Sequence, residues 1–416
     1  MSGRVKGWCP DLYAPMEAGD GWLVRVKPPF SRLDASMAAG VAAAAARCGN
    51  GIIEITARAN LQVRGLTKDS LNEFAQTMVA LGVASTNHAF EAIRNVVVSP
   101  LLDDDPGIDS STFLIATTLL NALQIDSKFY NLPGKFGFAV DGGGVLSLAS
   151  PGADMNLRAT GDDWLITPNG SALSLVVAAP QAAGAAMALA NLCLEYGRTR
   201  MNPLLSRVSL QDCLTKAGLD QLELVTTPPP APPLRPGPYS YGGARPGGLL
   251  VAPRFGQLTA DDLTLLADLA SRYGNSSIRV TSARLLALTG LPTNAMTTVK
   301  TALCQVGMIT EAHDPAYNIT ACPGSPHCQS GHKPARLDAA WLAGQWSWYL
   351  PGLHISGCTK GCAHPGRSPL TLVGQAGGYA LILDGTASGT PATHNLTPDA
   401  ALRLIRHLHA NKEAPL

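Results

Sequence analysis

The stretch Arg47-Cys-Gly-Asn-Gly-Ile-Ile-Glu-Ile-Thr56 returns 225 residues later as Arg272-Tyr-Gly-Asn-Ser-Ser-Ile-Arg-Val-Thr281. The match extends outward at the same offset, because Val26-Lys-Pro-Pro-Phe30 aligns with Val251-Ala-Pro-Arg-Phe255. A gapless match at one constant offset indicates an internal duplication. The chain therefore carries two copies of one small unit.

Each copy has the pattern of a small α+β unit. In the first copy, Val24 and Val26 alternate with polar residues, and residues 34–47 have helical periodicity. Residues 53–56 and 61–64 are again strand-like. This order is typical of a ferredoxin-like half-domain, and the fixed offset argues against two unrelated α/β units. The expected fold class is α+β and internally duplicated, with each ferredoxin-like half-domain followed by a larger α/β domain.

A Pro-rich segment separates the two copies. Residues 226–238, Thr-Thr-Pro-Pro-Pro-Ala-Pro-Pro-Leu-Arg-Pro-Gly-Pro, have the composition of an extended, polyproline-like linker. The interface between duplicated halves is a natural binding place for a large ligand. The predicted domains are a half-domain at 1–75, an α/β domain at 76–225, the linker at 226–247, a second half-domain at 248–300 and a second α/β domain at 301–416.

Composition excludes several functional classes. The chain has 416 residues, of which 46% are hydrophobic and 15% charged, and its net charge is +1. A disordered chain would be less hydrophobic and more highly charged, and a nucleic-acid-binding chain would be more basic. The first ten residues lack the apolar core of a secretion signal. We therefore expect a cytoplasmic protein with no nucleic-acid partner.

The most apolar long stretch is not expected to cross a membrane. Residues 173–194 are rich in Ala and Gly, and Pro180-Gln181 interrupts them. A buried strand at 173–179 followed by a helix at 182–194 fits this pattern better than a span. The sequence therefore predicts no membrane association.

Four of the nine cysteines form two close pairs. Cys322 and Cys328 are spaced C-x5-C, and Cys358 and Cys362 are spaced C-x3-C. Zinc sites usually have other spacings, whereas four thiolates from two loops suit a [4Fe–4S] cluster. Neighbouring Pro and Gly residues argue against the alternative of scattered core cysteines. The other five are interpreted as core or incidental residues: Cys9, Cys48, Cys193, Cys213 and Cys304.

These cysteine pairs on a duplicated chain resemble the sulfite and nitrite reductase family. Ile55-Thr-Ala-Arg-Ala-Asn-Leu-Gln62 is similar to its T-x-R-x3-Q segment, Arg94-Asn95-Val96 to its R-N-V segment, and Leu132-Pro-Gly-Lys-Phe-Gly137 to its L-P-R-K-F-K segment. In that family a siroheme lies between the halves, and the last cysteine, here Cys362, bridges it to the cluster. The resemblance covers nearly the whole chain.

Two departures from the reductase pattern point to one branch of the family. Gly134 and Gly137 stand where the reductases have an arginine and a second, anion-binding lysine. The second cysteine loop reads Ser356-Gly-Cys-Thr-Lys-Gly-Cys-Ala-His-Pro365 in place of C-P-N-G-C. Together these segments resemble the precorrin-3B synthase branch, in which the tetrapyrrole is the substrate and not the cofactor.

The resemblance implies an oxidoreductase of aerobic cobalamin biosynthesis. It would be an O2-dependent monooxygenase that hydroxylates precorrin-3A at C20 with γ-lactone formation. The implied cofactors are a [4Fe–4S] cluster on the four paired cysteines and a mononuclear non-haem iron, whose ligands the sequence does not identify. Gly142-Gly-Gly144 lacks the spacing of a nucleotide-binding loop. Reducing equivalents, formally from NADH, are therefore expected through an external electron donor or reductase.

A reduced tetrapyrrole carries carboxylates around its rim, and binding them requires several separated cations. The candidate substrate-binding residues all lie in the first half of the chain: Arg58, Gln62, Arg64, Arg94, Asn95 and Lys135. Four histidines near the cysteines are interpreted as residues of the loops or of the surroundings of the ligands, and not as ligands: His313, His327, His354 and His364. The catalytic acid and base stay unassigned. Two alternatives stay open, a siroheme-dependent sulfite or nitrite reductase and a non-enzymatic tetrapyrrole-binding electron carrier.

Overall fold

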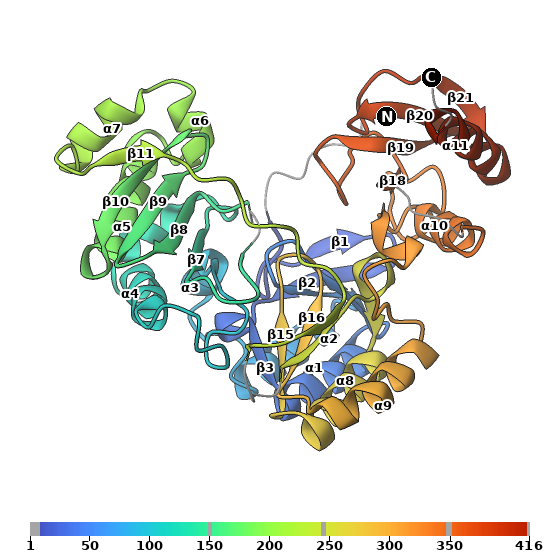
Figure 1. Ribbon diagram of the computed structural model, residues 1–416, viewed down its shortest axis with the longest axis horizontal. Coiled ribbons are helices and arrows are strands. Elements are labelled where there is room, and N and C mark those ends of the chain that lie inside the picture. Colours follow the sequence, from blue (N-terminus) through green and yellow to red (C-terminus); the bar gives the residue numbers. More distant parts are fainter. Residues whose placement is uncertain (1–8, 149–151, 243–246, 347–351, 414–416) are drawn as a thin grey trace.

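The computed structural model describes residues 9–148, 152–242, 247–346 and 352–413. The first eight residues of the predicted first half-domain and residues 243–246 of the predicted linker lie outside this description. Figure 1 shows a central body built from both copies of the repeat, with one larger domain on each side of it.

The two copies contain the same elements in the same order. The first copy has β1 (Met16–Ala18), β2 (Gly21–Val26), β3 (Arg32–Asp34), α1 (Ala35–Cys48), β4 (Ile52–Ile55), β5 (Leu61–Leu66) and α2 (Ser70–Ala80). The second copy has β12 (Gly237–Tyr239), β13 (Gly248–Val251), β14 (Gln257–Thr259), α8 (Ala260–Tyr273), β15 (Ser277–Val280), β16 (Leu286–Thr289) and α9 (Thr293–Gln305). The duplication predicted from the sequence is therefore present in the fold.

Each copy completes the sheet of the other. The sheet orders are β1-β2-β5-β4-β14 and β12-β13-β16-β15-β3, so the third strand of each copy pairs in its partner's sheet. Leu258 of β14 pairs with Ile53 of β4, and Leu33 of β3 pairs with Ile278 of β15. Both copies consequently share one hydrophobic core, in which α1 packs against α8.

A sharp turn sends each exchanged strand across. Phe30 and Phe255, at equivalent positions, have positive φ angles of 49° and 58°. Residues other than glycine rarely adopt this left-handed backbone conformation. Both turns lie directly before β3 and β14, the strands that pair in the sheet of the other copy. Because both copies have this backbone conformation, the exchange of β3 and β14 is a property of the repeated unit itself.

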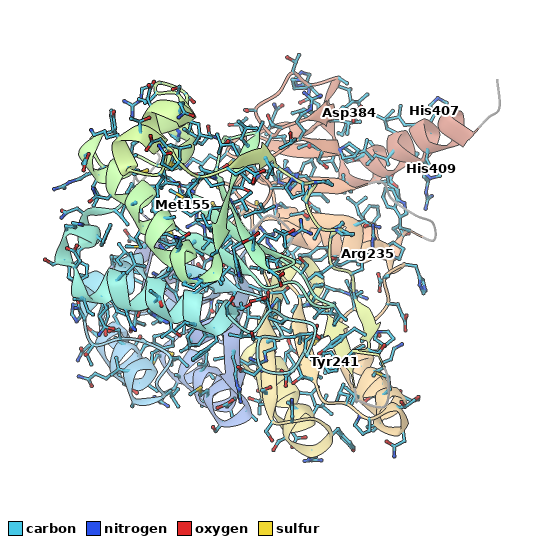
Figure 2. All side chains as sticks on the ribbon, turned by 60° about the vertical axis from the view of Figure 1, so that its left-hand side comes forward. Met155, Arg235, Tyr241, Asp384, His407 and His409 are labelled. Carbon is cyan, nitrogen blue, oxygen red and sulfur yellow. The ribbon has the colours of Figure 1, made fainter. Side chains whose placement is uncertain are left out.

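The two larger domains, which follow the two copies, also have related sheets. The first contains α3 (His88–Ile93), β6 (Val96–Val98), α4 (Thr112–Ile125), β7 (Phe138–Asp141), β8 (Met155–Thr160), β9 (Asp163–Pro168), β10 (Leu173–Ala178), α5 (Ala179–Glu195), α6 (Met201–Leu205), α7 (Leu210–Ala217) and β11 (Leu224–Thr226). The second contains β17 (Ile319–Ala321), α10 (Ala335–Gly344), β18 (Leu353–Ser356), β19 (Ser368–Gln375), β20 (Gly378–Gly385), β21 (Thr393–Leu396) and α11 (Pro398–Glu413). In each sheet three parallel strands, β6-β7-β8 or β17-β18-β19, are followed by antiparallel ones. Figure 2 locates Met155, which is fully buried in the first of these domains, and Asp384 in the second.

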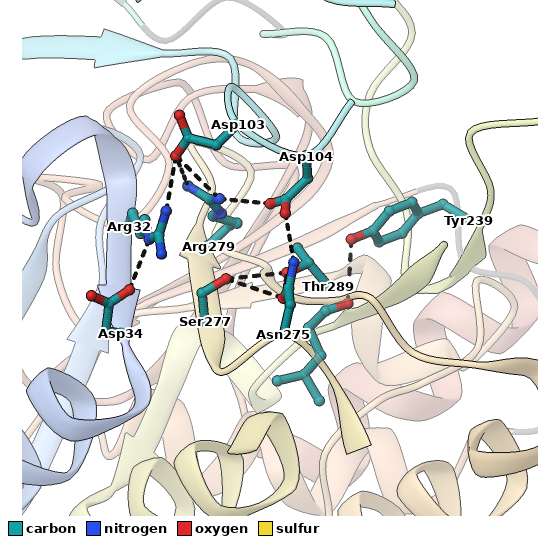
Figure 3. Close-up of polar contacts among 10 residues, drawn as sticks. Arg32, Asp34, Asp103, Asp104, Tyr239, Asn275, Ser277, Arg279 and Thr289 are labelled. Carbon is teal, nitrogen blue, oxygen red and sulfur yellow. Dashed lines mark hydrogen bonds and ion pairs between the residues drawn. The ribbon is translucent and has the colours of Figure 1, made fainter. Parts of the chain in front are cut away.

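Buried ion pairs join the second copy to the first large domain. Arg279 of β15 is fully buried, and its guanidinium lies 2.6 Å from Asp104 and 3.4 Å from Asp103 (Figure 3). The neighbouring Arg32 of the exchanged strand β3 also pairs with Asp103, at 3.0 Å. The second half-domain therefore binds the loop with Asp103 and Asp104, which belongs to the large domain that follows the first half-domain.

The apolar stretch 173–194 is divided into a strand and a helix, as the sequence predicts, because β10 ends at Ala178 and α5 begins at Ala179. The helix begins three residues earlier than expected, and Pro180 lies in its first turn, where proline costs no hydrogen bond. The end of the predicted linker is not a free connection, because Gly237–Tyr239 pairs with β13 as an edge strand. Among the described helices, none is long and apolar enough to span a membrane.

Candidate functional site

A pocket lies between the first half-domain and the first large domain. It is lined by Arg58 from the turn between β4 and β5, by Arg94 and Asn95 before β6, and by Gly137 before β7. Lys27, at the end of β2, also lines it. The structure thus brings three of the six candidate substrate-binding residues to one cavity.

Arg58 is a cation without a counter-ion in this pocket. Among the described residues its guanidinium makes no ion pair, whereas the Thr56 hydroxyl accepts hydrogen bonds from the backbone N–H groups of Arg58 and Asn60. Burial and the neighbouring positive charge of Arg200 lower the pKa of Arg58. A guanidinium held in this way is available to an anionic ligand.

Arg94, by contrast, is engaged by the protein. Its guanidinium pairs with the fully buried Glu91 at 2.9 Å and donates to the carbonyls of Lys27 and Val83 at 2.9 and 3.0 Å. Lys27 donates to the carbonyls of Glu91 and Ala92, and burial lowers the pKa of Lys27 to about 8. These contacts fix the wall of the pocket and the joint between the two domains.

Asn95 shapes the loop that carries Lys135. The Asn95 amide donates to the carbonyls of Gly134 at 3.2 Å and Phe136 at 2.9 Å. Lys135 itself is exposed and does not line the pocket. A Cβ added at Gly137 would lie 3.1 Å from the Asn95 carbonyl oxygen, and Gly137 does not have a positive φ. Gly137 is therefore suited to close packing beside the pocket and not to a turn that only glycine can make.

The buried carboxylate of Asp154 supports this edge of the pocket. Asp154 accepts the N–H of Gly137 at 3.1 Å and pairs with Arg200 at 2.8 Å. The positive charge of Arg200 also lowers the pKa of Arg58. The Asp154 carboxylate therefore links the backbone of Gly137 to the arginine that acts on Arg58.

Gln62 and Arg64 lie in a separate polar network. Arg64 is buried and pairs with both oxygens of Asp20, at 2.7 and 2.8 Å, and with Glu54 at 3.4 Å. The Gln62 amide also donates to Glu54, at 2.6 Å. Burial opposes ionisation of Glu54, but Arg336 and Arg64 hold the pKa of Glu54 below its ordinary value. Neither Gln62 nor Arg64 lines the pocket.

The four paired cysteines lie in two neighbouring loops. β17 and β18 are adjacent parallel strands, with Ala321 opposite Ile355, so both loops leave the same edge of the sheet. Cys322 directly follows β17, and Cys358 and Cys362 follow β18. The parallel topology thus explains why cysteines about 30 residues apart in sequence meet.

Glycines bring the two cysteine loops into backbone contact. A Cβ added at Gly357 would lie 2.9 Å from the Cα of Gly324 and 3.4 Å from the Cα of Gly331. The loops are joined by a hydrogen bond from His332 N–H to the Gly357 carbonyl, at 2.8 Å. The Gly357 N–H also donates to the Cys322 sulfur at 3.1 Å.

The thiols form one electrostatic group, and their chemistry fits an iron–sulfur cluster. Burial raises the pKa of Cys322, as do Cys328 and Cys358, and burial and the other three cysteines raise the pKa of Cys362. Clustered thiolates require positive centres to hold their charge, and sulfur is the donor that cluster iron prefers. Within the described residues, no group of three or more Cys, His, Asp or Glu is placed to hold a single metal ion.

His354 is a strand residue beside the second cysteine loop, which excludes one expected placement, in a loop, and agrees with the other, next to the candidate ligands. It lies in β18 with 1% of its surface exposed, and neither of its ring nitrogens has a hydrogen-bond partner among the described residues. The ring of His364 lies 5.6 Å away. Burial, His364 and Arg284 lower the pKa of His354 to about 4.

Two residues of these sites were not predicted from the sequence: Lys27, which lines the pocket, and Arg284, which contacts the second cysteine loop. Lys27 had a signal, because it ends a strand of alternating residues directly before Pro28-Pro29. No pattern in the sequence indicates Arg284, because the residue at the equivalent position of the first copy is Ala59. Both positions share a positive φ, 54° at Ala59 and 62° at Arg284.

Comparison with known proteins agrees with the duplicated architecture. The model of the nitrite/sulfite reductase ferredoxin-like half-domain matches residues 14–81 and 247–306. A precorrin-3B synthase from Sinorhizobium sp is 33% identical over 422 aligned residues, which cover 98% of this chain and 90% of the relative. The chain belongs to the nitrite/sulfite reductase-like family that includes precorrin-3B synthase. This confirms the family resemblance and the α+β fold class with two ferredoxin-like half-domains.

Two further similarities are weaker in sequence identity. The ferredoxin–nitrite reductase of Synechococcus elongatus is 25% identical over 89% of this chain and 79% of its own. The Mycobacterium tuberculosis NirA protein superposes with a TM-score of 0.71 at 18% identity, covering 95% of this chain and 81% of its own. The second similarity establishes the shared fold.

Proposed function

We propose that this family member is a precorrin-3B synthase, an O2-dependent monooxygenase that hydroxylates precorrin-3A at C20 with γ-lactone formation in aerobic cobalamin biosynthesis. The observation that carries this proposal is Gly137, which packs beside the pocket of Arg58 and Asn95. Because glycine stands there, this edge of the pocket lacks the second lysine that a small bound anion would need, and the Asn95 backbone packs against the glycine instead. The 33% identity to the Sinorhizobium enzyme supports the same substrate.

In this proposal Arg58 binds a carboxylate of the tetrapyrrole directly, because it lines the pocket and its guanidinium makes no ion pair among the described residues. Lys135 stands exposed at the neighbouring loop and binds a carboxylate on the outer rim of the substrate. Arg94 and Asn95 hold the wall and the loop in place through their hydrogen bonds. Gln62 and Arg64 contribute through the Glu54 network and not through contact with the ring.

Cys322, Cys328, Cys358 and Cys362 would hold the [4Fe–4S] cluster, which supplies one-electron transfer when bound. The electrons would come from an external donor or reductase of cytoplasmic location. The mononuclear non-haem iron stays part of the proposal, but we assign it no ligands. The chain's own contribution is to orient the ring against the pocket, whose wall is held by the buried Glu91 and whose edge is held by the buried Asp154.

The test is anaerobic purification followed by absorption spectroscopy and turnover with precorrin-3A under isotopically labelled dioxygen. We expect a broad iron–sulfur absorption without sharp bands in the red, and one labelled oxygen atom in the product. Sharp red bands together with sulfite or nitrite reduction would establish the siroheme-dependent alternative. Binding of precorrin-3A without any oxygen incorporation, in the presence of a reductant, would leave the tetrapyrrole-binding electron carrier.

A further inference from the structure

Two arginines, one from each copy of the repeat, reach the two cysteine loops. Arg64 of β5 donates to the carbonyl of His327 at 3.2 Å, directly before Cys328. Arg284, in the turn between β15 and β16, donates to the carbonyl of Ala363 at 2.7 Å, directly after Cys362. Each loop is therefore held by a different half-domain.

The two arginines differ in how their charge is balanced. Arg64 has Asp20 and Glu54 as ion-pair partners. Arg284 has no ion pair among the described residues, and the nearby Glu54 is already bound by Arg336 and Arg64. Burial lowers the pKa of Arg284, with a smaller opposing effect of Glu54. A half-buried cation without a counter-ion is costly unless a ligand supplies the negative charge.

His354 gives a second, independent observation at the same place. It is almost fully buried and lies against Gly361 of the second cysteine loop, yet within the described part of the chain both of its ring nitrogens lack a hydrogen-bond partner. An unsatisfied buried polar group costs about 1–3 kcal/mol. The second cysteine loop thus has both an uncompensated cation and an unsatisfied imidazole beside it.

We propose that Arg284 is a charge-compensating and positioning residue for the iron–sulfur cluster, acting beside His354 on the loop that carries Cys358 and Cys362. The inference rests on the cluster of the proposed function. Four thiolates give such a cluster a net negative charge, which grows when it accepts an electron. A nearby positive charge therefore stabilises the reduced form more than the oxidised form and raises the reduction potential. Through the Ala363 carbonyl, the same side chain fixes the loop.

The experiment compares Arg284→Gln and Arg284→Lys in the anaerobically reconstituted full chain. Iron and sulfide are counted per chain, and the midpoint potential is measured by dithionite titration followed by electron paramagnetic resonance. Arg367→Gln is the matched control, because Arg367 belongs to the same loop region but is exposed to solvent.

Arg284→Gln is expected to shift the midpoint potential to more negative values. The expected shift corresponds to about tenfold in the reduction equilibrium, which is about 59 mV for one electron. Arg284→Lys should restore most of the shift because it keeps the charge, and Arg367→Gln should leave the potential unchanged. If Arg284→Gln lowers cluster content so far that no potential is measurable, recovery of the content in Arg284→Lys supports the proposal equally.

Equal behaviour of the Gln and Lys variants, whether both match the wild type or both lose the cluster, would overturn charge compensation. A wild-type chain that binds no cluster at all contradicts the proposed cofactor instead, so the two failures are distinguishable. A shift in Arg367→Gln as large as that in Arg284→Gln would also overturn the proposal, because the effect would then not depend on burial.

Discussion

Glu54 and Arg279 occupy the same position in the two copies of the repeat, and each makes a buried ion pair with the large domain that follows the other copy. Glu54 pairs with Arg336 at 2.7 Å, and Arg279 pairs with Asp104 at 2.6 Å. The sign of the charge is reversed between the copies. The first half-domain presents a carboxylate at this position and pairs with an arginine, whereas the second presents an arginine and pairs with a carboxylate. These crossed pairs tie each large domain to the half-domain of the other copy, with one large domain on each side of the central body (Figure 1).

Replacing Arg279 by Met should destabilise the protein, because Asp104 would remain as a partly buried carboxylate without its cation. Breaking a buried pair from one side costs about 3–5 kcal/mol. We expect the first unfolding transition in urea to move to lower concentration, with a much smaller shift for Arg32→Ala, whose side chain is partly exposed. Equal shifts for both variants would contradict the importance of burial at Arg279.

Replacing any one of Cys322, Cys328, Cys358 and Cys362 by Ser should lower the iron and sulfide content, because each cysteine provides one thiolate. Cys304→Ser is the control, since Cys304 is exposed and its sulfur contacts only the Thr310 hydroxyl among the described residues. Iron and sulfide analysis of anaerobically reconstituted protein measures the effect. A complete cluster in Cys322→Ser would show that the ligand assignment is wrong.

Gly137→Lys should impair turnover of precorrin-3A about a hundredfold or more without loss of iron, because it adds a cation and a side chain beside the pocket. Gly137→Ala separates the two effects, since its Cβ alone meets the Asn95 carbonyl oxygen at 3.1 Å. Product formation and iron content are measured together. Full activity in Gly137→Lys would show that the pocket does not need this glycine.

Arg58→Ala should weaken substrate binding by about 1.5–3 kcal/mol, the contribution of one charge-assisted hydrogen-bonding partner. Its guanidinium is the unpaired cation of the described pocket, so little else in the chain is disturbed by its removal. Lys68→Ala, an exposed cation outside the pocket, serves as the control. Equilibrium binding of the tetrapyrrole gives the difference, and equal affinities of the two variants would rule out the assigned contact.

The buried Lys27 should make stability depend on pH. Its pKa is about 8 in the folded chain and about 10.4 in an unfolded one. Between these values the unfolded state binds more protons, so stability rises with pH. Compared with Lys27→Met, the wild type should gain about 3 kcal/mol across this interval. Urea unfolding of both proteins at pH 8 and above pH 10 measures the gain, and a constant difference would contradict it.

The repeat and the cysteine pairs were predictable because their signals are local. Identity at a constant offset predicts the half-domains, and the Cys322 and Cys358 spacings predict neighbouring loops. The strand exchange was not predictable, because β3 and β14 are three residues long and their partners are more than 200 residues away.

The separate roles of Arg58 and Arg64 were harder to predict from the sequence. Arg58 and Arg64 stand six residues apart in one similar segment, yet one lines the pocket and the other reaches a cysteine loop. Strand alternation tells which residues share a face but not which domain covers that face. That information comes from the placement of the large domains, which the Glu54 and Arg279 pairs determine.

The exchange of β3 and β14 has a consequence for synthesis on the ribosome. When the first half of the chain has emerged, β4 still presents an open hydrogen-bonding edge, because its neighbour Gln257–Thr259 has not yet been translated. An unpaired edge can recruit other strands and lead to aggregation. The nascent chain therefore needs protection, by a chaperone or by rapid translation of the Pro-rich segment, until the second copy arrives to close the sheet.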